Sequence, residues 1–251
     1  MTVQNGETIA VWFSCGAASA VASMITLRDY GHANVRIVNN PVIEEDEDNR
    51  RFLNDVQGWL GVEIEIAMNS KYLGCSAVDV WDNRKFMSGV GGAPCTLELK
   101  KVARQQWELR NNPDWHVLGF TADEKKRAEN FIRGERENMI PVLVDEGLTK
   151  ADCFQIIRDA KIDLPRMYKL GYPNANCIGC VKATSPTYWN HVRRMHPDVF
   201  RQRCTQSREI GAKLVRVRNE RIFLDELKET DTGKPMKNLD FECGIFCEEK
   251  L

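Results

Sequence analysis

Cysteine is the residue type whose number and spacing first suggest chemistry in this 251-residue chain, because there are nine of them. Cys177 and Cys180 form a CxxC motif with Gly179 inside it, in the turn-rich stretch Leu164–Lys182. Two thiolates at that spacing can converge on one metal ion or form a redox pair. The first residues, Met1–Gly6, are polar and carry no signal-peptide core. An odd number of cysteines in such a chain argues against a disulfide framework. We therefore expect metal or thiol chemistry in the cytoplasm.

A single CxxC motif supplies only two ligands, and a closed zinc or iron–sulfur centre needs more. Cys95 lies in a Gly-Gly-Ala-Pro loop, and Cys243 and Cys247 lie near the end of the chain. Any two of these three would complete a four-thiolate site. Three further cysteines have no motif around them and are expected at ordinary packing or surface positions: Cys75, Cys153 and Cys204.

A run of small residues, Ser14–Ser19 (SCGAAS), connects a predicted buried strand over Thr8–Phe13 with a predicted helix that extends to Tyr30. Backbone N–H groups converge at such a loop, the helix N-terminus carries partial positive charge, and small side chains let a phosphate approach. Ser14 and Ser19 add hydroxyl donors. The loop therefore predicts a phosphate site, and the alternative is a tight turn whose small residues serve packing.

Two basic residues stand where they can bind an anion. Arg127 follows Asp123 by four residues, in a predicted helix Asp123–Ile132 that begins just past a strand end. That place is the carboxyl edge of a parallel sheet, and a guanidinium there can fork onto phosphate or sulfate oxygens. The alternative is a surface ion pair with Asp123. Lys100, in the predicted helix Thr96–Leu109, is either a phosphate-binding point charge or part of a solvated helix face.

The acidic run Glu44–Asp48 (EEDED) is typical of a solvated loop. The alternative is a Mg²⁺ site. Hard cations bind carboxylate oxygens, and Mg²⁺ takes one or two of them together with substrate phosphates.

Predicted strands and helices alternate through the first half of the chain. Strands are expected at Thr8–Phe13, Val35–Val38, Val62–Ile66, His116–Phe120 and Ile140–Val144, and further helices at Arg50–Leu60, Thr96–Leu109 and Asp123–Ile132. Strands separated by helices of this length predict βαβ units with right-handed crossovers. The fold class is therefore α/β, with an open, mainly parallel sheet and helices on both faces.

The pattern changes after the last of these strands. Thr149 and Asp152 resemble a capping box that opens a helix through about Ala160. Further helices and short apolar segments are expected at Pro186–Met195, Pro197–Ile210, Leu214–Val217 and Ile222–Leu224. The polar stretch Glu229–Asn238, which contains Gly and Pro, is expected to be a mobile linker. We predict an α/β domain over residues 1–148 and a helical, cysteine-bearing C-terminal region over residues 149–251.

Five segments, in the same order along the chain, resemble one family. The Ser14–Ser19 loop is similar to the pyrophosphate-binding loop, usually written SGGxDS, of the adenine nucleotide α-hydrolase (PP-loop) superfamily, with Cys15 at its first Gly and Ala18 at its Asp. The other four resemble elements of the phosphoadenosine phosphosulfate (PAPS) reductase-like branch: Glu45–Phe52 (ExxDNxRF), Gly92–Thr96 with Lys100 (PCT…LK), Gly119–Ala128 (G…DExxRA) and Asn176–Lys182 (NCIGCVK).

This resemblance covers about residues 10 to 250 and implies a PP-loop/HUP-like fold that binds an adenine nucleotide, ATP or PAPS. The implied nucleotide-binding residues are Ser14, Cys15, Gly16, Ala17, Ser19, Gly119 and Glu124, and Arg127 and Lys100 are implied as catalytic residues near the phosphates. The resemblance also favours a [4Fe–4S] cluster or active thiols over structural zinc. The implied metal ligands are Cys95, Cys177, Cys180 and Cys247.

The segment Glu242–Ile245 (ECGI) resembles the ECG(I/L)H tail of sulfonucleotide reductases, with Phe246 in the place of the His. In that family the cysteine attacks the sulfur of the nucleotide's sulfate and forms a thiosulfonate, from which a reductant releases sulfite. The resemblance thus implies a PAPS reductase-like enzyme with Cys243 as the catalytic nucleophile. The alternative is ATP-dependent activation followed by sulfur transfer to a nucleic acid or a small molecule. Ser19 favours this alternative, whereas Ala18 and the tail favour reduction.

Composition limits the expected partners. Lysine and arginine number 35 against 36 aspartates and glutamates, so a simple basic nucleic-acid binder is disfavoured. No apolar run approaches the length of about 18 residues that spans a membrane. Expected partners are the nucleotide, a thiol reductant or sulfur donor, a nucleic acid under the sulfur-transfer alternative, and a second copy of the chain.

A second class of function is a non-catalytic nucleotide-binding or interaction module. It would use a basic-aromatic patch on one predicted helix to meet RNA or DNA: Tyr188, Trp189, His191, Arg193 and Arg194. The competing interpretation of that helix is an ordinary amphipathic helix with Trp189 in the core.

Overall fold

The computed structural model describes residues 3–89, 92–236 and 239, and the chain divides into two compact units. The first unit holds Met1–Pro41, Glu47–Met68 and Arg104–Arg166, and the second holds Val42–Asp46, Asn69–Ala103 and Met167–Leu251. This division differs from the single boundary expected after residue 148. Val42, Trp81 and Leu99 share a hydrophobic core with Met167 and Trp189. Burial of apolar side chains, rather than order along the chain, therefore decides which segments form a unit.

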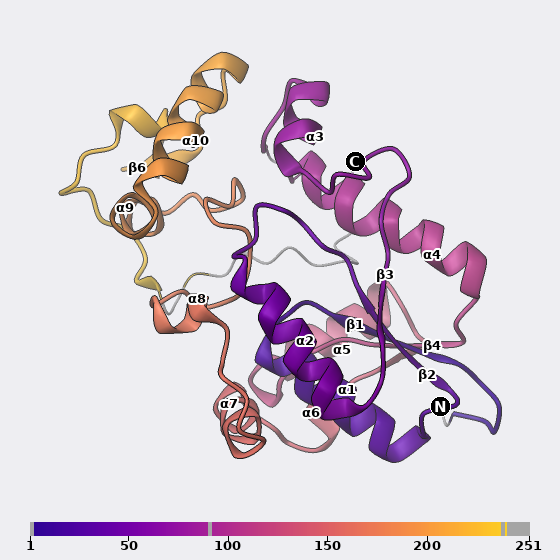
Figure 1. Cartoon of the computed structure of the whole chain (residues 1–251). Coiled ribbons are helices and arrows are strands. Elements are labelled where there is room, and N and C mark those ends of the chain that lie inside the picture. The colour runs from indigo at the N-terminus through magenta and orange to yellow at the C-terminus, as the bar shows by residue number, and fades with distance from the viewer. Residues whose placement is uncertain (1–2, 90–91, 237–238, 240–251) are drawn as a thin grey trace. The chain divides into compact units, whose positions relative to one another are not determined.

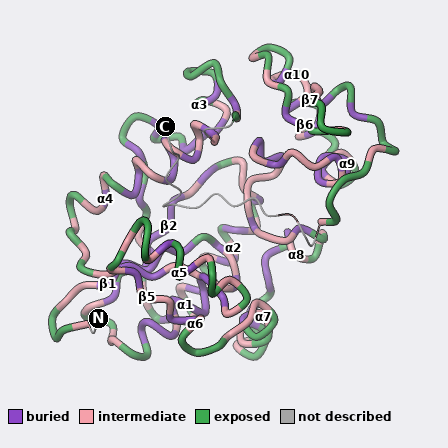
Figure 2. Tube along the Cα trace, turned by 180° about the vertical axis from the view of Figure 1, so that it is seen from behind, coloured by how far each residue is buried: buried purple, intermediate pink, exposed green. Residues whose placement is uncertain are grey.

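A parallel sheet forms the centre of the first unit (Figure 1). Within the described residues its five strands are β1 (Ile9–Phe13), β2 (Val35–Asn39), β3 (Ile64–Ile66), β4 (Trp115–Val117) and β5 (Met139–Ile140). Their order is β3-β2-β1-β4-β5, and every neighbouring pair is parallel. All residues of β1 are buried (Figure 2), which is typical of a central strand with helices on both faces. The predicted α/β fold class is confirmed.

Helices cover both faces of this sheet. They are α1 (Ala17–Tyr30), α2 (Asp48–Leu60), α4 (Ala103–Asn111), α5 (Lys125–Gly134), α6 (Val142–Asp145) and α7 (Lys150–Asp159), with a 3₁₀ turn, η2 (Ala122–Glu124), before α5. Successive side chains of a strand point to opposite faces. The ring centroid of Trp12 lies 5.4 Å from that of Trp107 in α4, and the centroid of Phe13 lies 6.2 Å from that of Phe52 in α2. These contacts place α2 and α4 on opposite faces.

Helices dominate the second unit. Its described elements are α3 (Ala77–Arg84), the π-helical segment η1 (Thr96–Val102), α8 (Arg166–Lys169), α9 (Pro186–Met195), α10 (Pro197–Ile210), the strands β6 (Val215–Val217) and β7 (Glu220–Ile222), and a 3₁₀ turn, η3 (Leu224–Glu226). Tyr188 and Trp189 of α9 are among the largest fully buried side chains of the chain. α9 therefore contributes the central aromatic part of this unit's core. The strands β6 and β7 pair antiparallel.

The predicted strand Ile140–Val144 is wrong after its first residue, because β5 ends at Ile140 and α6 begins at Val142. Pro141 has no N–H to give to a strand ladder. Its carbonyl oxygen instead accepts hydrogen bonds from Val144 N (2.9 Å) and Asp145 N (3.0 Å). A helical turn therefore replaces the strand. Helix α3 lies outside the predicted elements altogether.

The expectation that Glu229–Asn238 is a mobile linker is corrected for its described part, which is hydrogen-bonded to α9. The buried amide of Asn190 donates from Nδ2 to the carbonyl oxygens of Lys228 (2.9 Å) and Asp231 (2.9 Å). Gly233 N donates to Thr187 Oγ1 at 2.8 Å. The last two residues of the stretch lie outside the described residues. Polar composition alone did not predict that these carbonyl groups have a buried partner.

His116 in β4 lies in the interior of the first unit and is 1% exposed. Burial, together with the charges of Arg136 and Arg104, lowers the pKa of His116 from 6.5 to about 3. Its Nδ1 accepts a hydrogen bond from Trp12 Nε1 at 3.1 Å. The ring is therefore neutral in the folded protein near neutral pH.

We predict that the free energy of unfolding falls as the pH is lowered from 7 to 5. In the unfolded chain the imidazole of His116 binds a proton near pH 6.5, but in the folded chain only near pH 3. Between these values the unfolded state holds more protons, so stability rises with pH and is lost as the pH falls. One such group lowers the free energy of unfolding by about 2 kcal/mol between pH 6.5 and 5. Urea unfolding at the two pH values, with His116→Gln as the comparison, measures this loss; an undiminished pH dependence in the variant would contradict it.

Candidate functional site

The carboxyl ends of β1 and β4 mark the point where the strand order of the first unit reverses, and ligands of open α/β sheets bind at such a point. β1 leads into α1 through Ser14–Gly16, and β4 leads into η2 through residues 118–121. Because β1 and β4 are parallel neighbours, both loops lie at the same edge of the sheet. The predicted phosphate loop therefore lies where the fold class places a nucleotide.

Ser19 holds this loop in shape through its hydroxyl group. Its Oγ accepts a hydrogen bond from Ser14 N at 3.1 Å and donates one to Gly16 O at 2.9 Å. Ser19 is 3% exposed, whereas Ser14 is exposed and its own Oγ lies 3.3 Å from Ser19 Oγ. Ser19 thus organises the loop from within, and Ser14 presents its hydroxyl to solvent.

The N-terminus of α1 is open to an anion. The N-cap residue is Gly16, which has no side chain to cap the helix, and the first turn contains no acidic residue. The first N–H groups of a helix have no acceptor within it, and the helix dipole adds positive potential. Helix α3 offers the contrast, since the carboxylate of Glu44 accepts hydrogen bonds from Ala77 N (2.8 Å) and Val78 N (3.2 Å). At α1, no side chain among the described residues takes that place.

Cys15 contributes backbone shape rather than an exposed thiol. Its φ of 56° is left-handed, a conformation that costs a non-glycine residue about 1 kcal/mol. The side chain is 3% exposed, and Asn39 Nδ2 lies 3.6 Å from its Sγ and donates to Phe13 O at 2.8 Å. Asn39, at the end of β2, thus fastens the loop to the neighbouring strand. The sequence analysis missed Asn39. The feature that could have indicated it is a polar residue directly after the predicted strand Val35–Val38.

Gly119 occupies a position that has no room for a side chain. A Cβ there would lie 2.8 Å from Ser19 N and 3.1 Å from the carbonyl carbon of Ala18. Backbone atoms cannot move aside as the end of a flexible side chain can, so glycine is required for this close approach. The chain after β4 and the first turn of α1 are therefore adjacent, and a role for Gly119 in binding stays a prediction.

Glu124 and Arg127 pair with each other at the start of α5. Glu124 Oε2 closes a capping box with Thr121, and Oε1 accepts from Arg127 Nη1 at 2.7 Å. The alternative interpretation of Arg127, a surface ion pair with Asp123, is met instead by a pair with Glu124, and Asp123 Oδ2 accepts a hydrogen bond from Lys150 N at 3.1 Å. The Arg127 side chain is 40% exposed and lies over the Phe120 ring. It is held near the sheet edge, while the Glu124 carboxylate serves the local fold.

The CxxC motif belongs to the second unit and lies between α8 and α9. Tyr188 Oη accepts a hydrogen bond from Cys180 N at 2.9 Å, and complete burial raises the pKa of Tyr188 well above its ordinary value. Ile178 N donates to Glu44 O at 2.9 Å. Cys180 is buried and Cys177 is partly exposed. The motif is thus fixed at its backbone, and Cys177 is the less buried of its two cysteines.

Arg203 of α10 is a buried cation beside this motif, with an exposure of 3%. Its Nη1 donates to Gln206 Oε1 at 2.7 Å and its Cζ lies 4.7 Å from the Trp81 ring centroid, but its Nε has no hydrogen-bond partner within the described part of the chain. A Cβ added to Gly179 would lie 3.5 Å from that Nε. The inner glycine of the motif therefore packs directly against the guanidinium side chain.

The electrostatic surroundings of Arg203 include the motif itself. Burial lowers the pKa of Arg203, whereas Glu44, Cys177, Tyr188 and Cys95 raise it. A buried cation is costly unless negative charge compensates it, so this site favours anionic sulfur or another anion at the cysteines. The sequence analysis missed Arg203. Its signal was an arginine three residues after Phe200 and four before Ser207, on the core-facing stripe of a helix.

The acidic run Glu44–Asp48 is not simply a solvated loop, because several of its carboxylates bind groups of the chain, and the alternative of a Mg²⁺ site stays a prediction. Glu44 caps α3, and Asp48 Oδ1 accepts from Arg51 Nε at 2.6 Å. Glu45 Oε1 lies 3.0 Å from Lys100 Nζ, with the two side chains 11% and 8% exposed. Lys100 is therefore not on a solvated helix face, and its predicted role at phosphates stays a prediction.

No group of three or more His, Cys, Asp and Glu side chains is placed to hold a metal ion within residues 3–89, 92–236 and 239. Cys95 and Cys177 are partly buried and pack against the core of the second unit. Cys243 and Cys247 lie outside the described residues. The described cysteines therefore do not form a ligand set that fits a [4Fe–4S] cluster, and we derive no chemistry through one.

The basic-aromatic patch considered for α9 is not formed, because its aromatic side chains are buried. Tyr188 and Trp189 are 1% and 0% exposed, and Trp189 Nε1 donates to Ala183 O at 2.7 Å. Arg193 Nη2 donates to Leu227 O at 2.7 Å. The amphipathic alternative, with Trp189 in the core, is confirmed because large aromatic rings gain most from burial.

The sequence matches no protein-family model and no curated protein. Among solved structures, a U34-tRNA thiolase, NcsA from Methanococcus maripaludis with its [4Fe-4S] cluster, is similar at 13% sequence identity and a TM-score of 0.41, over 82% of this chain and 70% of that one. A TM-score this low does not bear on function, so the assignment depends on the chain's own fold and side chains. No helix among the described residues is long and apolar enough to cross a membrane.

Gly119→Ala tests the loop geometry. The added methyl group meets the backbone at Ser19, so the loop must shift and lose aligned donors for a phosphate. We expect ATP affinity, measured by calorimetry, to fall by about tenfold or more, the worth of one or two hydrogen bonds to a charged group. Gly58→Ala in α2 is the matched control, since nothing lies within 4 Å of its Cβ position. Equal ATP affinities for the two variants would refute the role of Gly119.

The cysteines should differ in reactivity. Burial raises the pKa values of Cys153 and Cys204 to about 11, so about one thiol in a thousand is a thiolate at pH 8. Cys177 is partly exposed and near a buried guanidinium. We expect iodoacetamide at pH 8 to label Cys177 at least about ten times faster than either, as followed by peptide mass spectrometry. Faster labelling of Cys153 would count against this description.

Proposed function

We propose that this chain is an enzyme that binds ATP at the Ser14–Ser19 loop and uses it to replace an acceptor oxygen by sulfur, with the cysteines of the second unit handling the sulfur. The observation that carries the proposal is the open N-terminus of α1 at the switch point of the sheet, closed on one side by Gly119. It supports phosphate binding because helix N–H groups, dipole and small residues coincide there.

The side chains of the first unit suit the pyrophosphate part of ATP. Ser14 and the N–H groups of the first turn of α1 are donors, and Ser19 keeps them aligned. Arg127 adds a partly exposed cation at the end of β4. Donors fixed before the substrate arrives need little reorganisation when charge develops on the leaving group.

The second unit supplies the surroundings for sulfur. Cys177 is partly exposed, Cys180 is buried, and Arg203 provides positive charge beside Cys177 and Gly179. A thiolate is the reactive form of cysteine and is favoured near a cation. These features support sulfur handling by the cysteines.

The proposed reaction has two steps. The acceptor's carbonyl oxygen attacks the α-phosphorus of ATP, so an O–P bond forms and pyrophosphate leaves. A sulfur donor at the oxidation level of hydrosulfide then attacks the carbonyl carbon of the activated acceptor, and a C–S bond forms. The C–O bond breaks, AMP leaves with the acceptor's oxygen, and one proton is released. Activation of the oxygen is needed because hydroxide is a poor leaving group and AMP is a good one.

Reduction of an adenylylated sulfate by Cys243 is the second candidate, and the sequence of the tail Glu242–Ile245 favours it. That reaction consumes PAPS or its relative without a 3′-phosphate and releases sulfite. The proposal of ATP-dependent transfer is preferred because the loop retains Ser19 and because two partly exposed cysteines, Cys95 and Cys177, lie near Arg203.

Ser19→Ala and Ser23→Ala form a matched pair. Both serines are buried in α1, and each hydroxyl donates to a backbone carbonyl, Ser19 to Gly16 O at 2.9 Å and Ser23 to Ser19 O at 2.8 Å. Only Ser19 also fixes the loop. We expect Ser19→Ala to lower AMP and pyrophosphate formation, assayed with sulfide and candidate acceptors, by about a hundredfold in kcat/KM, and Ser23→Ala to change it less than about threefold.

Nucleotide choice separates the two candidates. Calorimetry with magnesium and either ATP or PAPS should give tighter binding of ATP, and incubation of the protein with PAPS and dithiothreitol should release no sulfite. Release of sulfite that is lost in Cys243→Ser would replace the proposal by the reductase. Failure to bind either nucleotide would refute both.

A further inference from the structure

The hairpin of β6 and β7 places two arginines directly opposite each other. The strands are antiparallel, with Val215 paired to Ile222, Arg216 to Arg221 and Val217 to Glu220. Like charges directly opposite on one face of such a pair destabilise it. Burial and the charge of Arg216 both lower the pKa of Arg221. The folded hairpin thus holds an unfavourable concentration of positive charge.

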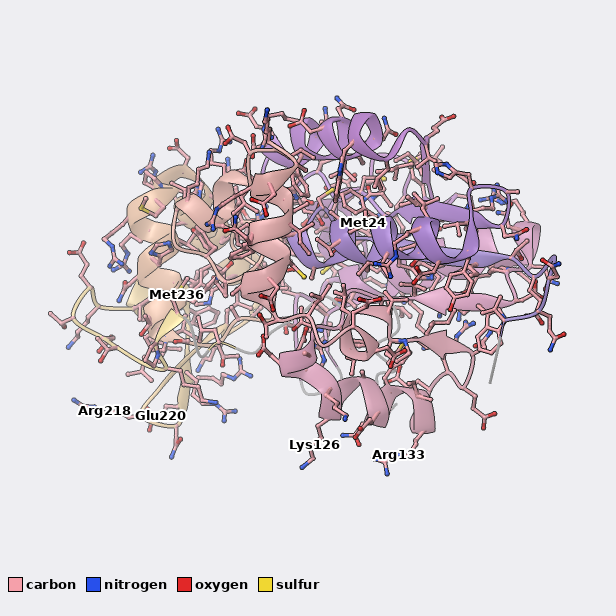
Figure 3. The ribbon with its side chains drawn as sticks, turned by 90° about the horizontal axis from the view of Figure 1, so that it is seen from below. Met24, Lys126, Arg133, Arg218, Glu220 and Met236 are labelled. Atoms are coloured by element: carbon pink, nitrogen blue, oxygen red, sulfur yellow. The ribbon has the colours of Figure 1, made fainter. Side chains whose placement is uncertain are left out.

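The two faces of the hairpin differ in character. Val215 is fully buried, and Val217 and Ile222 pack against the core of the second unit. Arg216 and Arg221 share the opposite face, because side chains alternate along a strand. The turn residues Arg218 and Asn219 both have positive φ values, 47° and 71°, the geometry of a tight hairpin turn. Figure 3 shows Arg218 and Glu220 pointing outward at the tip.

Four cations lie on or beside this hairpin: Lys213, Arg216, Arg218 and Arg221. The side chains of Arg216 and Arg218 make no hydrogen bond or ion pair within the described part of the chain, and Arg221 Nη1 donates to the carbonyl oxygen of Leu214 at 3.1 Å. Nearby Arg208 differs, since it pairs with Asp225 and Glu226 at 3.0 and 2.9 Å. The carboxylates of Asp225 and Glu226 are therefore used by Arg208, and the hairpin cations keep their charge for a partner.

We propose that the β6–β7 hairpin binds the phosphate backbone of a nucleic acid. The inference deepens the proposed function, on which it rests for the step from bound nucleic acid to sulfur acceptor. A row of phosphates neutralises several cations at once and releases the counterions held on the nucleic acid. Such a partner removes the repulsion between Arg216 and Arg221 that the free protein carries.

Other anionic partners fit the hairpin less well. A membrane-binding tip needs apolar side chains to enter the lipid, but the tip residues Arg218, Asn219 and Glu220 are all polar and exposed. A small anion could meet the opposed pair Arg216 and Arg221, but it would leave Arg218 at the turn and Lys213 before β6 without a partner anion. An extended polyanion matches cations spread along a ribbon.

The test compares two variants that lose the same charge. Arg216→Gln/Arg218→Gln removes two hairpin cations, and Lys126→Gln/Arg133→Gln removes two exposed cations that point away from α5 (Figure 3). Fluorescence anisotropy with single-stranded RNA, folded RNA and duplex DNA measures affinity from about 50 to 200 mM salt, the range over which phosphate contacts are weakened. We expect the hairpin variant to bind about tenfold more weakly, with a salt slope smaller by about two, and the control to stay within about twofold.

Glu220→Gln provides a test in the opposite direction. It removes the carboxylate at the hairpin tip and should tighten binding of nucleic acid a few-fold, because one repulsive charge is lost. The hairpin variant should bind ATP like the parent.

Three results would overturn the inference: no binding of any nucleic acid by the parent, equal losses in the hairpin and control variants, or a stronger hairpin-dependent binding to phosphatidylserine vesicles than to nucleic acid. Each of these results differs from failure of the proposed function, in which the parent protein does not bind ATP.

Discussion

The close approach of Gly119 to the backbone at Ser19 is the constraint on which the first unit's candidate site depends. It brings the chain after β4 against the first turn of α1, so the two loops at the reversal of strand order form one surface. Ser19 then sets the position of Ser14, and Asn39 joins the same loop to the end of β2. Three strand ends therefore determine one loop, and a rigid loop can hold donors aligned before a ligand arrives.

Buried charge has a comparable role in the second unit. Arg203 lies between the ring of Trp81 and Gly179, with few polar partners for its charge. Glu44 connects this region to α3, since its carboxylate caps that helix while its carbonyl oxygen binds Ile178 of the cysteine motif. Removing charges from water is costly unless they find partners, so this arrangement ties the position of the motif to the capped helix and to α10.

A formal net charge of -1 conceals how the charges are divided. Carboxylates of the acidic run pair with Lys100 and Arg51 or cap a helix, and those near α10 pair with Arg208. The cations of the β6–β7 hairpin have no such partners in the described part of the chain. The local excess of positive charge, rather than the net charge of the chain, decides which surface attracts a polyanion.

The sequence by itself determined the elements whose cause is local. Apolar runs predicted β1 and β2, the small residues after β1 predicted the loop, and Thr149 with Asp152 predicted the start of α7 by a capping box that the structure contains. Their alternation predicted the parallel sheet, because parallel strands require crossover helices. These features depend on interactions between residues near each other in the chain.

Only the tertiary structure decided which distant groups become partners. Glu44 and Lys100 look like surface charges in the sequence, yet one caps α3 and the other is buried against Glu45. Arg203 belongs to no motif and becomes the cation beside the CxxC segment, whereas the sequence left both a surface patch and the core open for Trp189, which lies in the core. The physical reason is that burial and charge pairing depend on which side chains the folded chain brings within a few ångströms, and sequence spacing does not encode those distances.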